Sequence, residues 1–249
     1  MSTMESRSDA VRRLASAQKS ARGAGGYSRW INRPLGRQLA ALAYVRGWTP
    51  NQVTALSALC SAAGILVLAL VHPGVLMAVA VALLLALGYA LDSADGQLAR
   101  LRGGGSAGGE WLDHVVDAVK VSSLHAAVLV SWYRFFDLRH EALLLIPLAY
   151  GVVAASSYFA LTLTDQLRRV AAAKAGESAV ATPLVNPGEH APILRSLLVL
   201  PNDYGLLCVV MLLLALPSAF VVVYGLLLLA NFAYFLVGCA KWYREMSAI

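Results

Sequence analysis

The chain has 249 residues, of which 59% are hydrophobic and only 14% are charged, and its formal net charge is +6. A soluble domain carries about 25% charged residues, so this composition excludes an ordinary soluble protein and predicts an integral membrane protein. The positive charge then indicates basic segments that meet anionic lipid headgroups, and no nucleic-acid partner is expected.

The first 46 residues are expected to lie outside the bilayer. Residues 1–26 are rich in Ser, Ala, Gly and Arg and lack the apolar run of a signal peptide, which predicts a flexible cytoplasmic tail. From residue 27 to 46, Arg29, Arg33 and Arg37 recur every four residues, and the apolar residues occupy other faces. This pattern predicts an amphipathic helix lying in the membrane interface, with a plain solvated basic helix as the alternative.

Six apolar segments follow, so we predict an all-α polytopic membrane protein whose residues 27–249 form one domain. The predicted transmembrane helices cover residues 50–72, 74–100, 108–136, 140–168, 191–216 and 217–241. Lys and Arg outside these spans gather on the side of the two termini and of the 100–108 and 168–195 connections. Both termini are therefore predicted to be cytoplasmic in a multi-pass protein of the cell membrane.

Four aspartates occur at the cytoplasmic ends of the second and third predicted spans. Asp92 and Asp95 are three residues apart, and Asp113 and Asp117 are four apart, so each pair shares one helix face. The glycine-rich connection between the spans lets the two helices run antiparallel, so the four carboxylates are expected to converge. Lys120 is expected to face the same cleft, because a lone lysine in lipid is costly.

Four uncompensated acids at this depth would cost on the order of 10 kcal/mol. Carboxylate oxygens select hard cations, so the cluster predicts bound Mg²⁺ or Mn²⁺. Four carboxylates have room for two ions about 3.5–4 Å apart, a geometry suited to phosphoryl chemistry. Helix capping, or pairing with Arg100 and Arg102, would explain one or two aspartates better than it explains four.

The residues around the acids are suited to a phosphate. Gly96 and Ala99 keep one helix face small, so that a flat group can approach. Arg100 offers a planar fork of donors for phosphate oxygens, and Ser106 adds a hydroxyl beside glycine N–H groups.

This spacing resembles the signature of the CDP-alcohol phosphotransferase family, D-x2-D-G-x2-A-R-x8-G-x3-D-x3-D. Its eight fixed positions are filled by Asp92, Asp95, Gly96, Ala99, Arg100, Gly109, Asp113 and Asp117. Residues 48–54, WTPNQVT, are similar to a TPN-x-VT stretch common in that family. With six spans and a basic interfacial helix, the similarity covers about residues 27–245.

The resemblance implies an enzyme of phospholipid biosynthesis that transfers a substituted phosphate from a CDP-linked donor to an alcohol hydroxyl and releases CMP. It implies that the four aspartates bind metal, that Asp117 is also the general base, and that the enzyme is a homodimer among membrane lipids. The implied contacts to the CDP group are Asn51, Gln52, Val53, Thr54, Gly96, Ala99, Arg100, Ser106 and Gly109.

The two substrates stay open at this point. CDP-diacylglycerol is the favoured donor on chain length and span number, whereas Gly109–His114 resembles the branch that transfers from CDP-choline or CDP-ethanolamine to diacylglycerol. Candidate contacts to the acceptor are Arg168, Arg169, Arg195 and Asp203, although Asp203 is equally a helix-start signal after Pro201.

Two interpretations from other classes are a membrane cation transporter and a non-catalytic membrane scaffold. No pair of spans is broken in matching halves, which argues against a transporter built from inverted repeats.

Overall fold

The structure is a computed structural model that describes residues 6–16, 25–175 and 193–248, all of whose regular elements are helices. The α-helices are α1 (Arg7–Ser16), α2 (Arg33–Val45), α3 (Pro50–Leu70), α4 (Val75–Leu101), α5 (Ala107–Phe135), α6 (Leu145–Lys174), α7 (Ile193–Leu198), α8 (Tyr204–Val210) and α9 (Pro217–Met246). The π-helical turn η1 (Ser28–Asn32) leads into α2, and the 3₁₀ segments are η2 (Glu141–Leu144), η3 (Leu200–Asn202) and η4 (Met211–Ala215).

Five helices in the described part of the chain are long and apolar enough to cross a bilayer. They are α3, α4, α5, α6 together with η2, and α9. The shortest, α3, has 21 residues, which corresponds to about 31 Å and matches the hydrocarbon thickness of a bilayer. The prediction of an all-α polytopic membrane protein is confirmed, and these helices correspond to predicted spans one to four and six.

The predicted fifth span, 191–216, is not one continuous helix. Its apolar part is Tyr204–Ala215, whose length falls short of a full span. Pro201 lies in η3 just before the break, and the Asp203 side chain begins α8 by accepting a hydrogen bond from the Gly205 N–H at 3.0 Å. Asp203 is therefore a helix N-cap, and a count of six spans stays a prediction.

Residues 7–16 correct the expectation of a flexible tail, because they form α1. Ala10 and Leu14, one turn apart, are fully buried against α2 and α4. The Arg13 guanidinium donates a hydrogen bond to the Leu101 carbonyl at 3.2 Å. These contacts dock the short helix against α2 and the end of α4. Residues 1–5 and 17–24 of the predicted tail lie outside the described part.

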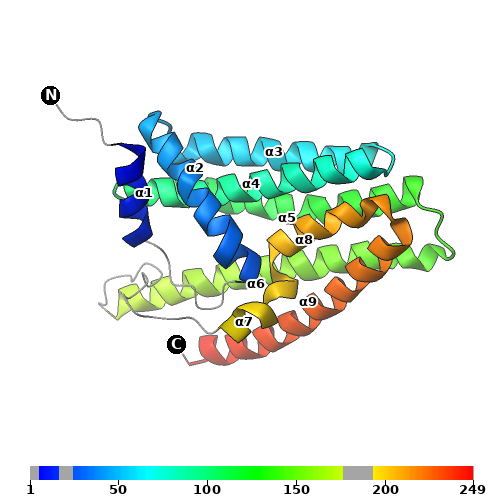
Figure 1. Ribbon diagram of the computed structural model, residues 1–249. Coiled ribbons are helices and arrows are strands. Elements are labelled where there is room, and N and C mark those ends of the chain that lie inside the picture. Colours follow the sequence, from blue (N-terminus) through cyan, green and yellow to red (C-terminus); the bar gives the residue numbers. More distant parts are fainter. Residues whose placement is uncertain (1–5, 17–24, 176–192, 249) are drawn as a thin grey trace.

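The predicted amphipathic helix is present as η1 and α2, which cross the bundle obliquely beside α4 (Figure 1). Gly36 and Ala40 are buried on the bundle side, whereas Trp30, Ile31 and Leu35 are exposed. Small residues thus let α2 approach α4, and bulky apolar residues are left for the membrane interface.

Helix α3 packs closely along both α4 and α5. The Ser57 hydroxyl donates a hydrogen bond to the Gly88 carbonyl at 2.8 Å, and a Cβ at Gly88 would collide with the Ser61 hydroxyl. Helices α4 and α5, in contrast, make no extended backbone contact. Space is therefore left between the two helices that carry the four aspartates.

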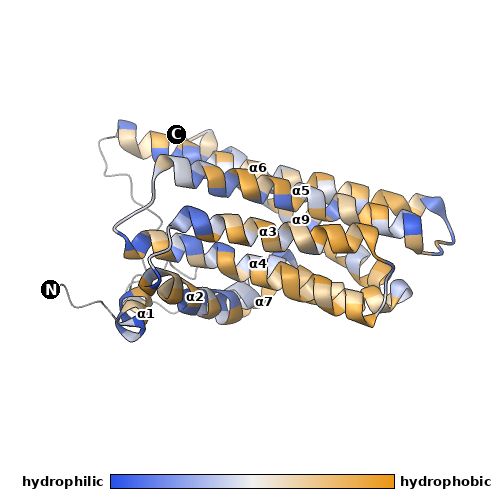
Figure 2. Cartoon of the chain, turned by 90° about the horizontal axis from the view of Figure 1, so that it is seen from above, coloured by the Kyte–Doolittle hydropathy of each residue, from blue (hydrophilic) through white to orange (hydrophobic). Residues whose placement is uncertain are grey.

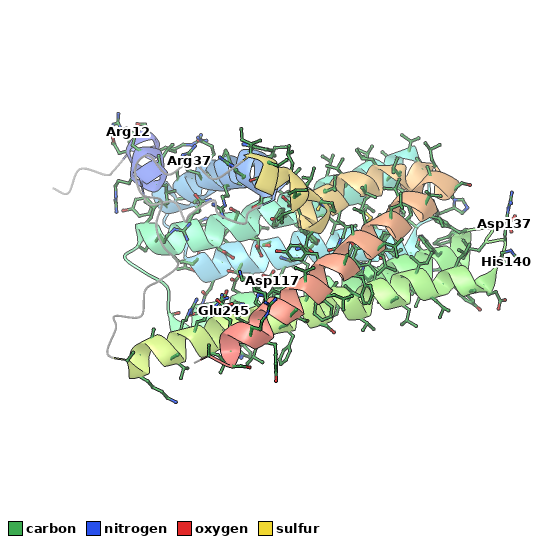
Figure 3. All side chains as sticks on the ribbon, turned by 90° about the horizontal axis from the view of Figure 1, so that it is seen from below. Arg12, Arg37, Asp117, Asp137, His140 and Glu245 are labelled. Carbon is green, nitrogen blue, oxygen red and sulfur yellow. The ribbon has the colours of Figure 1, made fainter. Side chains whose placement is uncertain are left out.

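The two ends of the bundle differ in composition. The connections α3–α4 and α5–α6 lie at one end, and α1, the α4–α5 connection and the C-terminus lie at the other (Figure 1). Arg12 and Arg37 mark this second end, opposite Asp137 and His140 (Figure 3). Apolar residues dominate the length between the ends (Figure 2).

Candidate active site between α4 and α5

Three of the four aspartates meet between α4 and α5. Carboxylate oxygens of Asp92, Asp113 and Asp117 all lie within 4.8 Å of one another, and Asp117 points into the space between the helices (Figure 3). The four-residue spacing places Asp113 and Asp117 on one face of α5, as predicted. The structure therefore brings together one acid from α4 and two from α5.

The fourth aspartate, Asp95, lies one turn away from this trio. It is 5% exposed and accepts a hydrogen bond from the Thr54 hydroxyl at 2.6 Å. Thr54 also contacts the Pro50 carbonyl at 3.1 Å in the first turn of α3. Asp95 thus links the acid cluster to the start of α3 and faces the cavity described below.

Lys120 bridges the two helices at the centre of the cluster. Its Nζ lies 2.8 Å from Asp92 Oδ1 and 2.7 Å from Asp117 Oδ1. The side chain of Lys120 is 5% exposed, and those of Asp92 and Asp117 are 20% and 26% exposed. The prediction that Lys120 faces the polar cleft is confirmed. Its ammonium partly balances two carboxylates that would otherwise repel each other.

The acid trio fits a divalent metal ion. Its donors are all carboxylate oxygens, close enough together to share one ion, and hard cations such as Mg²⁺ and Mn²⁺ prefer oxygen ligands. The Lys120 ammonium is shared between Asp92 and Asp117, and a divalent cation would add positive charge among the carboxylates. Asp92, Asp113 and Asp117 would hold the ion, with Asp95 as a further ligand to an ion placed toward the cavity.

A cavity of about 560 Å³ opens beside the cluster, between the starts of α3 and α5 and the end of α4. Gly96 forms part of its wall, and a Cβ there would meet only the Arg100 guanidinium, at 3.8 Å. The predicted contacts that line this cavity are Asn51, Thr54, Asp95, Gly96, Ala99, Arg100, Ser106, Gly109 and Asp113.

Local sequence explains the shape of this cavity. Thr49 and Gln52 form a capping box at the start of α3, and Pro50 occupies the first helical position. Gly103 and Gly104 have φ values of 91° and 132°, which glycine adopts readily. The Ser106 hydroxyl then caps α5 by accepting a hydrogen bond from the Gly109 N–H at 3.0 Å. Ser106 therefore has a structural role as well as its place in the wall.

Arginines supply the positive charge of the cavity. Arg100, Arg102 and Arg169 all line it. The Arg100 Nε is buried and has no hydrogen-bond partner among the described residues, whereas Arg102 donates to the Trp48 carbonyl at 2.7 Å. An anionic group in this cavity would offer Arg100 a partner. The sequence pattern gave Arg102 no such role, and Arg169 was expected at the acceptor.

Two of the predicted CDP contacts lie outside the cavity wall. The Gln52 side chain accepts a hydrogen bond from the Thr49 N–H at 2.9 Å. Val53 is 1% exposed and packs in the core between α2, α3 and α4. Both residues shape the start of α3 in the structure, because only every third or fourth residue of a helix faces the same side.

The candidate acceptor residues are spread over different places. Arg168 bonds to Asp165 and to Glu245, each at 2.7 Å. Arg169 pairs with Glu110 at the rim of the cavity. Asp203 faces a second cavity, deeper in the bundle. Arg195 belongs to α7, but its side chain lies outside the described part of the chain.

A polytopic helical bundle with an acidic cluster beside an arginine-lined cavity defines a class of membrane protein that handles phosphate groups together with divalent cations. The chain belongs to the CDP-alcohol phosphatidyltransferase family, whose sequence profile matches residues 47–240. It is accordingly a membrane-embedded, divalent-metal-dependent transferase of substituted phosphate groups in phospholipid synthesis. No curated protein sequence gives a match.

Solved structures with a similar fold include phosphatidylinositol phosphate synthase PgsA1 of Mycobacterium tuberculosis in complex with manganese and citrate. It is 20% identical, with a TM-score of 0.51 over 84% of this chain and 87% of that chain. The same synthase with CDP-DAG bound gives 22% identity and a TM-score of 0.48, over 87% of this chain and 93% of that chain. At this identity the likeness to the manganese complex shows a shared fold.

Proposed function

We propose that the protein transfers a phosphatidyl group from CDP-diacylglycerol to the hydroxyl of an alcohol and releases CMP. The observation that carries this proposal is the position of the Asp92–Asp113–Asp117 trio directly beside the arginine-lined cavity. Three carboxylates alone would repel a nucleotide diphosphate, and three arginines alone would only bind it. Because the acid trio and the arginines are adjacent, a metal ion held by the acids would contact a pyrophosphate held by the arginines.

Each part of the cavity has a role in holding the donor. Arg100 is placed to bond with phosphate oxygens, and the open face of Gly96 admits a flat cytosine or ribose group. Asn51, Ser106 and Gly109 close the opposite wall at the starts of α3 and α5. The acyl chains of a lipid donor would stay in the bilayer beside the bundle.

The transfer needs one proton acceptor at the acid cluster. The acceptor oxygen forms a bond to the phosphorus distal to the cytidine, the bridging P–O bond breaks, and CMP leaves with that oxygen. Asp117 takes the hydroxyl proton, while Lys120, bonded to Asp117 Oδ1, holds the carboxylate in place. A divalent ion bound by Asp92, Asp113 and Asp117 would supply charge neutralisation to the pyrophosphate and the leaving CMP.

We further propose that the active site faces the cytoplasm. The end of the bundle that bears the acid cluster also bears Arg12 and Arg37, whereas the opposite connection around Asp137 and His140 carries few basic residues (Figure 3). Basic residues are retained on the cytoplasmic side of membrane proteins. A homodimer remains a prediction of the family resemblance.

The test is CMP release by the purified protein in detergent with CDP-diacylglycerol, Mg²⁺ and a panel of alcohols, with products identified by mass spectrometry. Asp117→Asn is expected to lower turnover by about 10²–10⁴-fold, the usual contribution of a general base. Asp137→Asn, an exposed acid at the far end, is the matched control.

Three outcomes would contradict the proposal. Full activity of Asp117→Asn would show that Asp117 is not the general base. Release of CMP only from CDP-choline or CDP-ethanolamine with diacylglycerol would reassign the donor. No release from either kind of donor, with metal flux into liposomes, would favour a transporter.

A further inference from the structure

A second cavity, of about 520 Å³, lies deeper in the bundle. Its walls come from α4, α5, α6, the α7–α8 region and α9, with Gly25 and Ser28 closing one side. No part of the nucleotide-binding role proposed above uses this cavity.

The acid cluster lies between the two cavities. Tyr89, one turn before Asp92 on α4, and Val121, one turn after Asp117 on α5, line the second cavity. Asp95, one turn after Asp92, and Asp113, one turn before Asp117, line the first, arginine-lined cavity. A helical turn rises about 5.4 Å, so Asp92 and Asp117 are within one turn of both cavities.

A hydrogen-bonded pair marks the boundary. Tyr158 lines the second cavity and His114 lines the first. The Tyr158 hydroxyl donates to the His114 carbonyl at 2.9 Å and lies 3.1 Å from its Nδ1. A small molecule in the second cavity could therefore present a hydroxyl at Asp117 from the side opposite the arginines.

The chemistry of the second cavity differs from that of the first. Its described lining has no Lys or Arg, and its one acid, Asp203, is held by the N–H groups of Ser28 at 2.8 Å and Gly205 at 3.0 Å. Aromatic faces make up much of the rest, among them Tyr89, Tyr158 and Trp242.

The lining also holds uncharged polar groups, among them Tyr204 and Asn231. The Tyr204 hydroxyl is buried and has no hydrogen-bond partner in the described part of the chain. The Asn231 amide bonds to the Tyr150 hydroxyl and to the Pro201 carbonyl, at 2.9 and 2.8 Å. These groups suit hydroxyls, and the Tyr204 hydroxyl in particular is left for a ligand to satisfy.

We infer that this second cavity binds the acceptor alcohol, and that the acceptor is an uncharged or ammonium-bearing alcohol without a phosphate group. The inference rests on the proposed transfer reaction. A phosphate dianion would be repelled by Asp203, and the described wall offers it no guanidinium or ammonium. Hydroxyl groups would bond to Tyr204 and Asn231, and an ammonium would be attracted by aromatic faces and by the carboxylate.

The experiment compares acceptors that differ only by a phosphate. Purified protein is assayed for CMP release from CDP-diacylglycerol with glycerol against sn-glycerol 3-phosphate, and with myo-inositol against myo-inositol 1-phosphate, and choline serves as the ammonium-bearing probe. At least one unphosphorylated alcohol is expected to show a kcat/KM more than tenfold above that of any phosphorylated one.

Two variants test the place of binding. Tyr204→Phe removes only the unpartnered hydroxyl, so it should raise the acceptor KM severalfold, leave the KM for CDP-diacylglycerol unchanged and cost no stability. Ala154→Phe fills the cavity and should raise the acceptor KM further. Ala149→Phe, at an exposed position of the same helix, is its control.

The acceptor inference is overturned by a preference for a phosphorylated acceptor, by turnover with none of the unphosphorylated alcohols, or by an unchanged acceptor KM in both Tyr204→Phe and Ala154→Phe. The proposed transfer reaction fails separately, when CMP release does not depend on Asp117.

Discussion

Removing the Lys120 ammonium tests whether the acid cluster is built for a cation. Lys120→Met keeps an unbranched side chain of nearly the same length but leaves Asp92 and Asp117 without the charge that now lies 2.8 and 2.7 Å from them. Breaking a buried ion pair from one side costs about 3–5 kcal/mol. Water screens part of that cost, because the two acids are 20% and 26% exposed, so we expect a loss of about 2–3 kcal/mol in metal-free buffer.

A divalent ion should reverse much of this loss. The ion would replace the missing positive charge, and the ammonium no longer competes for Asp92 and Asp117. A ligand at a free concentration of 100 times its Kd stabilises a folded protein by about 2.7 kcal/mol. The difference in free energy of unfolding between the variant and wild type should therefore shrink as Mn²⁺ is added.

The assay is unfolding by sodium dodecyl sulfate from mild detergent micelles, followed by circular dichroism, with EDTA or with Mn²⁺. Lys241→Met, an exposed lysine of α9, is the control and should match wild type in both buffers. If Lys120→Met is as stable as wild type in EDTA, or if Mn²⁺ leaves its loss of stability unchanged, the acid cluster is not built for a cation.

Two further predictions concern the nucleotide cavity. Gly96→Leu should raise the Kd for CDP by more than about tenfold. Little stability should be lost, because a Cβ at this position meets only the Arg100 guanidinium, at 3.8 Å. Calorimetric titration measures the Kd, and an unchanged value would show that Gly96 does not line the CDP site. Thr54→Val should destabilise the protein by about 1–3 kcal/mol, because Asp95 loses its buried hydrogen bond, while Thr54→Ser should retain most of the stability. Equal stability of the two Thr54 variants would contradict this role.

Much of the architecture could be predicted from the sequence, because lipid imposes a simple rule on apolar length. The limits of α3, α4 and α5 lie within two residues of the predicted spans. The rule fails for residues 191–216, where hydropathy alone cannot distinguish a continuous span from a helix that restarts at Asp203. Helix α1 was also missed, because two apolar residues one turn apart are too weak a pattern to distinguish a packed helix from a flexible tail.

The candidate site could be predicted in part. Helical spacing brought Asp92, Asp113 and Asp117 together as expected, but it could not show that Asp95 turns to Thr54 instead of joining the trio. That difference depends on how far α4 and α5 separate, which is set by their packing on α3. The second cavity had no signal in the sequence, because its lining comes from helices far apart along the chain.

Binding of Mn²⁺ itself is the most direct measurement of the claim that α4 and α5 gather a divalent ion. Electron paramagnetic resonance of the purified protein in detergent should show bound Mn²⁺, and Asp92→Asn and Asp113→Asn should each lower the affinity by more than tenfold. The exposed Asp137→Asn should bind as wild type does. Wild-type affinity in both cluster variants would contradict the account, whatever the transfer assay shows.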